Sequence, residues 1–134
     1  MSRSIEIPGA ARPRGYSSAM LAAGEHIYVS GQVGWNSDEV FETDDFAEQA
    51  AQALRNVVAI LHAAGAKADS IVRLTWYVTD KREYRAAMEN LGKAYRDILG
   101  RHYPAMTLVE VSALLEDRAK VEIEATAVRT VHEE

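Results

Sequence analysis

A serine followed by a glycine ends one apolar segment of the chain, at Val29-Ser30-Gly31-Gln32. The Ser30 hydroxyl, beside the backbone N–H groups that Gly31 leaves open, could hold a carbonyl, a carboxylate or a water, as an oxyanion hole does. Turn chemistry explains most Ser-Gly pairs, because the hydroxyl satisfies nearby backbone and the glycine permits a bend. Without other information, this pair therefore indicates a strand end before it indicates a site.

Two carboxylates lie on one side of an alternating segment near the end of the sequence. Glu122 and Glu124 alternate with Val121 and Ile123, so they share the face opposite the apolar one. Such a face ordinarily lies in water. At a subunit boundary, partial burial would raise the pKa of one carboxyl toward the range useful for acid or base catalysis. The pattern alone leaves both interpretations open, and solvated carboxylates are the commoner case.

Aromatic residues outside the apolar stripes are the third candidate. Tyr16 and Trp35 lie near predicted loops, where aromatic side chains often line sites or interfaces. Trp76 and Tyr95 fall on apolar stripes instead, which is typical of core residues. The sequence has no Gly-x-Gly-x-x-Gly, phosphate-binding loop, His-Glu-x-x-His or Gly-x-Ser-x-Gly, so nucleotide, zinc-protease and esterase chemistry has no support.

Two helices and several strands are expected to position these candidates. Apolar residues recur at steps of three and four over about residues 45–64, after the N-cap oxygens of Thr43-Asp44-Asp45 and before Gly65. A second helix is expected from Asp80 to about Leu99. The segments 18–22 and 26–31 predict a β-hairpin around Gly24. Further strands are predicted over residues 4–7, 71–78, 105–113 and 120–128.

The order of these elements predicts an α+β sandwich, with two helices packed on one face of a mixed sheet. No third helix is available to cover the second face, so we expect oligomerisation to cover it. A length of 134 residues suits one domain, residues 1–134. A domain of this size uses most of its apolar residues in its own core, so a deep pocket is easier to build between subunits.

Composition excludes several classes of protein. The chain has no cysteine, which removes disulfides, thiolate metal sites and a cysteine nucleophile. His26, His62, His102 and His132 share no short spacing, so no metal is expected. The net charge of −5 argues against nucleic acid as a partner. No apolar run resembles a signal peptide or approaches the roughly 20 residues that span a bilayer, so no membrane partner is expected and the predicted location is the cytoplasm.

Several segments, taken in order and spacing, resemble one family over nearly the whole chain. They are Gly15-Tyr16-Ser17, Val29-Ser30-Gly31-Gln32, the run from Gln49 to Val57, Ala64-Gly65-Ala66, Tyr77-Val78-Thr79-Asp80, Pro104-Ala105 and the run from Val121 to Ala127. The family is Rid, the reactive intermediate deaminases, also called YjgF-like. The resemblance implies a chorismate-mutase-like α+β fold and a homotrimer with a barrel-like centre. It also implies three ligand clefts between neighbouring subunits.

The resemblance further implies an activity that needs no cofactor. Archetypal members hydrolyse enamines and imines, such as 2-aminoacrylate, to ketoacids and ammonia. Tyr16, Ser30, Gly31 and Glu122 match the family's site residue by residue. By this resemblance, Glu122 and Ser30 are the expected catalytic residues, with Glu122 activating water. Tyr16 and Gly31 are expected to bind substrate.

Two positions of the family's site differ in this sequence. The arginine that would hold the substrate carboxylate falls on Met106, and the helix asparagine falls on or near Gly92. A thioether cannot supply the paired, charged hydrogen bonds of a guanidinium. The small polar or sulfur position beside that arginine is Leu108. The chain therefore resembles the Arg-lacking branches of the family, and Met106, Leu108 and Trp35 are expected to bind a larger imine, such as 2-aminomuconate.

Two other functions remain open at this stage. The first is a catalytically silent trimer that binds a small metabolite or another protein, in which Met106 marks the loss of the older activity. The second is RNA cleavage, which has been attributed to some relatives. The acidic balance of the chain and the absence of a histidine pair disfavour RNA cleavage.

Overall fold

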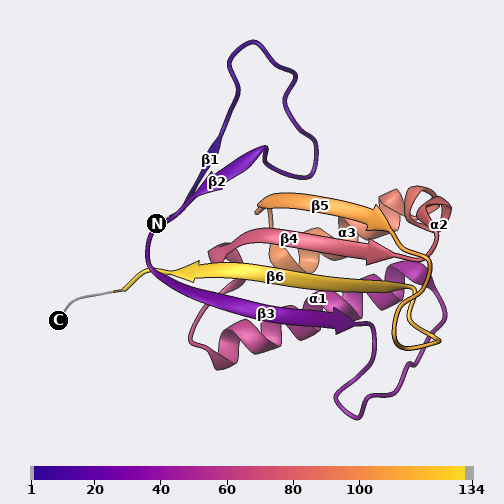
Figure 1. The fold of residues 1–134 in the computed structure, drawn as a ribbon. Helices are drawn as coiled ribbons and strands as arrows, with labels where there is room; N and C mark the ends of the chain where they lie inside the picture. The colour runs from indigo at the N-terminus through magenta and orange to yellow at the C-terminus, as the bar shows by residue number, and fades with distance from the viewer. Residues whose placement is uncertain (1, 132–134) are drawn as a thin grey trace.

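A mixed four-stranded sheet is the frame of the protein in the computed structural model, which describes residues 2–131 (Figure 1). Its strand order is β3-β6-β4-β5. The bounds are Glu25–Val33 for β3, Val121–Arg129 for β6, Ile71–Val78 for β4 and Ala105–Glu110 for β5. β6 runs antiparallel to both β3 and β4, whereas β4 and β5 are parallel. The predicted α+β class with a mixed sheet is confirmed.

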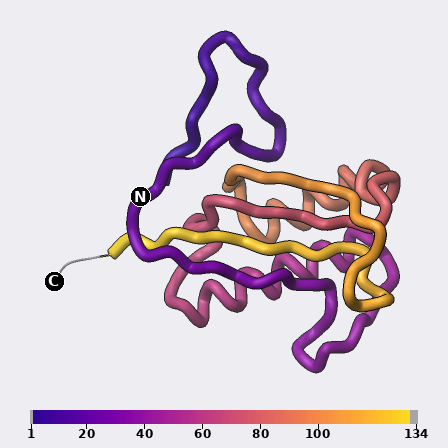
Figure 2. Tube along the Cα trace, in the orientation of Figure 1, coloured from indigo at the N-terminus to yellow at the C-terminus, as the bar shows by residue number. Residues whose placement is uncertain are grey.

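The helices lie on one face of this sheet, as the ribbon and the Cα tube show in the same orientation (Figures 1 and 2). α1 spans Phe46–Ala63, close to the predicted 45–64, and Asp45 caps it by accepting from the Glu48 N–H. Its apolar stripe is buried because it packs on the sheet residues Leu74, Trp76 and Ile123. The core lies between this stripe and the sheet.

The second predicted helix is divided in two. α2 spans Lys81–Ala86 and α3 spans Met88–Leu99, with a short 3₁₀ turn, η1, earlier at Ala68–Ser70. Ala87 interrupts the helix with φ −97° and ψ 5°. The break lets Tyr84 of α2 pack edge-on against Phe46 and Trp76, while α3 buries its own apolar stripe. No glycine or proline marks this position, so the sequence carried no local signal of it.

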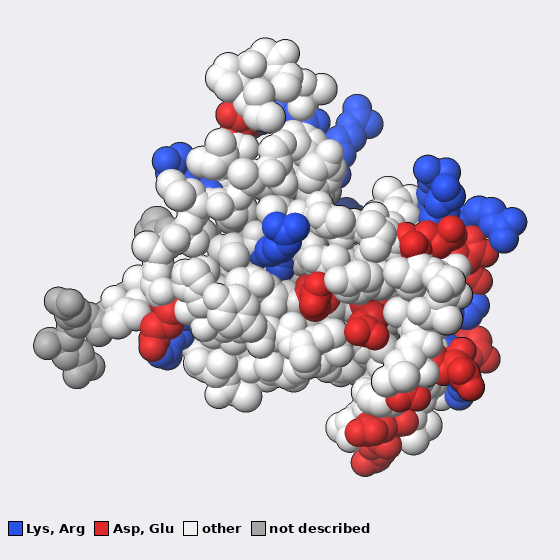
Figure 3. All heavy atoms as spheres, viewed as in Figure 1, with Lys and Arg blue, Asp and Glu red and all other residues white. Residues whose placement is uncertain are grey.

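The opposite face of the sheet carries no helix. Figure 3 views this uncovered face, which is mostly free of charged side chains. Tyr28, on β3, is 76% exposed there, and Val109, on β5, is also exposed. The predicted uncovered face is therefore present in the single chain.

The N-terminal segment forms an arm that differs from the prediction. β1, Arg3–Ile5, pairs antiparallel with β2, Ala19–Leu21, in a separate two-stranded sheet. The predicted hairpin between residues 18–22 and 26–31 is wrong, because β3 pairs with β6 and β2 pairs with β1. Figure 1 shows the arm projecting from the body beyond the β5 edge.

Contacts at both ends of β2 explain this course of the chain. The Ser17 N–H donates to the Pro104 carbonyl at 3.0 Å, and the Ser17 hydroxyl donates to the Tyr103 carbonyl, so the arm is tied to the start of β5. At the other end, Gly24 has φ +147°, and a Cβ there would lie 2.9 Å from the Arg129 carbonyl carbon. Gly24 therefore makes a bend between two sheets instead of a hairpin turn.

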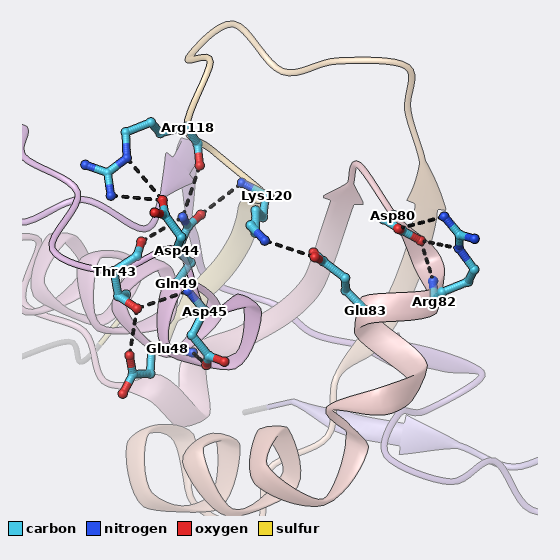
Figure 4. A network of polar contacts seen from close by, with 10 residues as sticks. All are labelled: Thr43, Asp44, Asp45, Glu48, Gln49, Asp80, Arg82, Glu83, Arg118 and Lys120. Carbon is cyan, nitrogen blue, oxygen red and sulfur yellow. Dashed lines mark hydrogen bonds and ion pairs between the residues drawn. The ribbon is translucent and has the colours of Figure 1, made fainter.

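A buried glutamine fixes the start of β6 against α1 (Figure 4). The Gln49 side chain is fully buried, and its Nε2 donates to the carbonyls of Thr43 and Arg118 at 3.0 Å each. Its Oε1 accepts from the Lys120 N–H at 2.9 Å. Both the amide nitrogen and the amide oxygen of Gln49 therefore have hydrogen-bond partners, as a buried amide requires. Because Lys120 directly precedes β6, this network sets where the strand begins and so where Glu122 lies.

Candidate functional site

Ser30 and Gly31 form a bulge in β3. The pairing of β3 with β6 is regular up to Val29 opposite Ala125 and resumes at Gln32 opposite Ile123. Two residues of β3 therefore face the single position of Glu124 on β6. Bulges of this kind redirect side chains and recur beside active sites. The Gln32 side chain adds a local contact, since its Nε2 donates to the Ser30 carbonyl at 3.0 Å.

The Glu122 side chain lies against the bulge. A Cβ at residue 31 would be 2.8 Å from the Glu122 Cδ and 2.9 Å from its Cγ, so only glycine leaves room for this carboxylate. No side chain in residues 2–131 donates a hydrogen bond to the Glu122 carboxylate. The structure thus brings Gly31 and Glu122 together and leaves a half-buried, unpaired carboxylate on the uncovered face.

The neighbouring carboxylate is engaged in a different way. The Tyr77 hydroxyl donates to Glu124 Oε1 at 2.7 Å, across the diagonal between β4 and β6. This hydrogen bond is the main reason that the pKa of Tyr77 is raised, with burial and the charges of Glu124 and Glu122 adding to it. The two carboxylates of the pattern therefore have different environments, and Glu122 is the one left available. Alternation placed Tyr77 on this face, but no local pattern indicated its hydrogen-bond partner.

A second group of predicted residues lines an apolar cavity on the other face of the sheet. This cavity, called here the helix-side pocket, has a volume of about 560 Å³ and lies between α2, α3, β4, β5 and the N-terminal arm. Tyr16, Gly92, Met106 and Leu108 are among its lining residues. Its volume falls within the usual range for small-molecule sites.

The structure separates the two groups because strand partners share a face. Met106 is the partner of Leu74 and Leu108 is the partner of Trp76, both of which are buried beneath the helices. Glu122 faces the opposite way. One chain alone therefore does not bring Met106 and Leu108 to Glu122. The clefts implied by the family resemblance lie between neighbouring subunits, so the single chain does not test whether these residues share one cleft.

Trp35 belongs to neither group in the described structure. It lies after β3, where its ring packs at 5.7 Å from the ring of Phe41. The Trp35 carbonyl accepts a hydrogen bond from Asn56 Nδ2 at 2.9 Å. This bond attaches the segment that follows β3 to α1. Trp35 is not among the residues that line the helix-side pocket.

Several residues that line the helix-side pocket were not assigned to a site from the sequence. The aromatic residues among them include Tyr95 and Tyr103, which stack at 5.5 Å with an interplanar angle of 6°. The Tyr95 hydroxyl donates to the His102 carbonyl at 2.6 Å, and burial raises the pKa of Tyr95. Two arginines, Arg14 and Arg96, also line the pocket. The spacing of four between Gly92 and Arg96 on α3 was the available signal for Arg96.

Histidines do not gather in the described part of the chain. Residues 2–131 contain no group of three or more histidine, aspartate or glutamate side chains that could hold a metal ion. His102 Nε2 donates to the Ile71 carbonyl at 2.6 Å, since a carbonyl can only accept. His132 lies outside the described residues. None of the helices within residues 2–131 has the length and apolar character needed to cross a membrane.

Residues 8–129 match the family model described as endoribonuclease L-PSP. The chain belongs to the Rid/YjgF/L-PSP family. A RutC family protein of Aquifex aeolicus is 35% identical over 127 residues, covering 95% of this chain and 99% of the relative. The 2-iminobutanoate/2-iminopropanoate deaminase of Escherichia coli K12 is 36% identical over 129 residues, covering 96% and 99%. The predicted family membership is therefore confirmed.

Solved structures of the family share the fold. YyfB of Yersinia pestis, a Rid family protein of unknown function, superposes with a TM-score of 0.83 at 29% identity, covering 96% of this chain and 98% of that one. Rv2704 of Mycobacterium tuberculosis superposes with a TM-score of 0.65 at 35% identity, covering 86% and 87%. The α+β YjgF fold is thus established for this chain.

Proposed function

We propose that the chain is a cofactor-free hydrolytic deaminase of enamines and imines. The observation that carries the proposal is the unpaired Glu122 carboxylate lying against Gly31 at the β3 bulge. Iminobutanoate and iminopropanoate deaminases at 34–36% identity, from Escherichia coli and Homo sapiens among others, support the reaction class.

The chemistry asks little of the protein, because an imine carbon is already electrophilic. Glu122 binds a water and takes a proton from it as the water oxygen bonds to the imine carbon. That proton passes to the imine nitrogen, which gives a carbinolamine. A second proton then moves from the carbinolamine hydroxyl to the nitrogen as the C=O bond forms and the C–N bond breaks, so a carbonyl compound and ammonia leave. The Ser30 hydroxyl and the backbone of Gly31 hold the polar end of the substrate, and Tyr16 closes the cleft. An enamine enters the same sequence after protonation at carbon.

The site is assembled between subunits of a homotrimer. Within one chain, Glu122 and the helix-side pocket lie on opposite faces of the sheet, so a neighbouring subunit is needed to bring a pocket to a carboxylate. The uncovered face supports this assembly, because Tyr28 and Val109 are exposed on it and no helix protects them.

The substrate range differs from that of 2-aminoacrylate deaminases of the Arg-containing kind. Met106 packs against the core beside Leu74 and supplies an apolar wall where a guanidinium would bind a carboxylate. A larger, aminomuconate-like imine suits this wall better than a three-carbon one. The chain is accordingly assigned to an Arg-lacking branch of the family.

The test is ammonia release from freshly generated imines. An amino-acid oxidase with catalase produces imines in place from several amino acids, and 2-aminomuconate is supplied separately. We expect release faster than in buffer for at least one bulky imine and its loss in Glu122→Gln. Glu124→Gln is the matched control, since an amide oxygen still accepts the Tyr77 hydrogen bond and activity should persist.

The alternative function is binding without turnover by a catalytically silent trimer, which the loss of the arginine at Met106 favours. Release no faster than buffer on every imine would overturn the deaminase. Under that outcome, a metabolite that raises the melting temperature of the protein and is recovered chemically unchanged would support the silent trimer.

A further inference from the structure

Aromatic side chains form a large part of the wall of the helix-side pocket. Five of the chain's ten Phe, Trp and Tyr residues line it, from the N-terminal arm, β4, α2, α3 and the segment before β5: Tyr16, Trp76, Tyr84, Tyr95 and Tyr103. Flat, rigid walls of this kind favour a flat ligand, because stacked and edge-on contacts between π-systems need planar partners. The shape of the wall therefore favours an aromatic or conjugated ligand over a short aliphatic one.

The charges around the pocket have a single sign. Arg14 and Arg96 are its charged lining residues, and no aspartate or glutamate lines it, although the chain as a whole carries a net charge of −5. Neither arginine forms an ion pair or a side-chain hydrogen bond within residues 2–131. Two unpaired guanidinium groups beside an apolar cavity concentrate a positive field where a ligand enters.

The Arg96 side chain lies along its own helix, α3, which forms one side of the pocket. Its Nη1 lies 3.3 Å from the position that a Cβ on Gly92 would take. The guanidinium therefore folds back along α3 over Gly92, which is also a lining residue. A guanidinium in this place presents its N–H groups to a planar carboxylate without a strand arginine at residue 106.

A buried donor in the same wall lacks a partner. The Trp76 side chain is 2% exposed and its Nε1–H has no hydrogen-bond acceptor within the described structure. Unpaired buried donors are rare, because each keeps the cost of its lost hydration. Trp76 meets the ring of Tyr84 edge-on at 6.3 Å, and both line the pocket. An acceptor atom on a ligand entering between these two rings would pair this N–H.

We infer that the helix-side pocket binds a planar, unsaturated carboxylic acid, with its carbon body between the aromatic walls and its carboxylate on Arg96 and Arg14. The anion-binding role is thereby carried by α3 and the N-terminal arm, while Met106 contributes to the apolar wall. That this acid has the carbon skeleton of the imine substrate rests on the deaminase proposal. That the pocket binds such an acid rests on its aromatic and arginine residues alone.

The experiment compares two probes of one shape, cinnamate and the neutral cinnamamide, by isothermal titration calorimetry on the wild-type protein. Cinnamate should bind about tenfold more tightly than cinnamamide, because only the carboxylate forms charge-assisted hydrogen bonds with guanidinium. Arg96→Gln and Arg14→Gln should each reduce this preference, and the double variant should abolish it. The affinity for cinnamamide should be unchanged in all three variants.

Two controls separate this inference from the deaminase proposal. Arg85→Gln, on the exposed part of α2 outside the pocket, should bind cinnamate as the wild type does. Glu122→Gln should also retain cinnamate binding while losing ammonia release. If cinnamate binding depends on the arginines but no imine is turned over, the deaminase proposal is overturned and the inference about the pocket stands. Absence of cinnamate binding, equal affinity for the two probes, or a preference that survives the double arginine variant would overturn the inference.

Discussion

The Glu122 side chain lies so close to the Cα of Gly31 that a methyl group on residue 31 would be 2.8 Å from the Glu122 Cδ. The glycine of the Ser-Gly pair and the carboxylate of the last strand are thus one structural unit, although 91 positions separate them in the sequence. The bulge in β3 creates the space, and the carboxylate occupies it.

Gly31→Ala tests this unit directly. The added methyl group must displace the Glu122 carboxylate, so deaminase activity should fall by at least about tenfold, as misplacement of a catalytic group by about 1 Å can do. Thermal unfolding should change little, because the displaced side chain is only half-buried. Ammonia release and a melting curve measure the two effects. The double variant Gly31→Ala/Glu122→Asp should fold as well as the wild type, since the shorter carboxylate avoids the methyl group. Full activity in Gly31→Ala would contradict this relationship.

Replacing Met106 tests the origin of the substrate range. Met106→Arg should raise kcat/KM for 2-iminopropanoate by about tenfold, because a guanidinium at residue 106 restores paired hydrogen bonds to a small substrate's carboxylate. It should reduce kcat/KM for bulky imines, which lose the apolar wall. Thr107→Arg places the same charge on the next residue, whose side chain faces away from the pocket, and should not produce the gain. If both variants behave alike, the range is set elsewhere.

Removal of Gln49 should weaken the whole fold. Gln49→Ala leaves the Lys120 N–H and the carbonyls of Thr43 and Arg118 without partners, which should lower the free energy of unfolding by about 3 kcal/mol. Gln52→Ala, on the same helix, removes hydrogen bonds between side chains only and should cost less than about 1 kcal/mol. Urea denaturation of the two variants gives the comparison. Equal losses would show that the buried network does not hold β6.

Stability should fall in alkaline solution because of Tyr95. Burial raises the pKa of this phenol above its ordinary value of 10.0, so the folded protein retains a proton that the unfolded chain releases. The contribution of Tyr95 is complete below pH 10 and is lost progressively as the pH rises above it. Urea denaturation at pH 8, 9.5 and 11 should show this decline. Tyr95→Phe should lose about 1 kcal/mol at pH 8, from the hydrogen bond to His102, and decline less steeply. Parallel curves for the two proteins would exclude Tyr95 as the cause.

The uncovered face should hold the subunits together. The wild-type protein should sediment as a trimer at micromolar concentration, and Tyr28→Asp should dissociate it, because Tyr28 is exposed in the single chain and would be buried in the assembly. Leu115→Asp, which changes an even more exposed apolar residue in the loop between β5 and β6, should remain trimeric. Sedimentation of the wild type as a monomer would contradict both the trimer and the shared site.

Local signals in the sequence account for what was predicted correctly. α1 begins and ends within one residue of its expected limits, because Asp45, the apolar stripe and Gly65 are all close together in the chain. Alternation likewise placed Glu122 and Glu124 on the uncovered face. The division of the second helix at Ala87 had no such signal, since no glycine or proline stands there.

The rest depended on contacts between distant segments. The arm turns away from β3 because Ser17 forms hydrogen bonds with the carbonyls of Pro104 and Tyr103. No residue near position 17 indicates these distant partners. The face taken by Met106 depends on the register between β4 and β5, which alternation within one strand cannot fix. Arg14 and Arg96 line one pocket because the fold brings the N-terminal arm close to α3, which the sequence did not indicate.

The order of strands in the sheet has a consequence for the way the protein acquires its structure. β6 comes last among the strands along the chain, yet it lies between β3 and β4. During synthesis, β3 therefore cannot pair until β6 has been made, about a hundred residues later. The N-terminal arm likewise cannot form its contacts until residues 103 and 104 have been made. Few native contacts of the sheet are local, which makes folding slow and exposes the long edge of β3 in the meantime. Segments early in this sequence are thus among the last to reach their final positions.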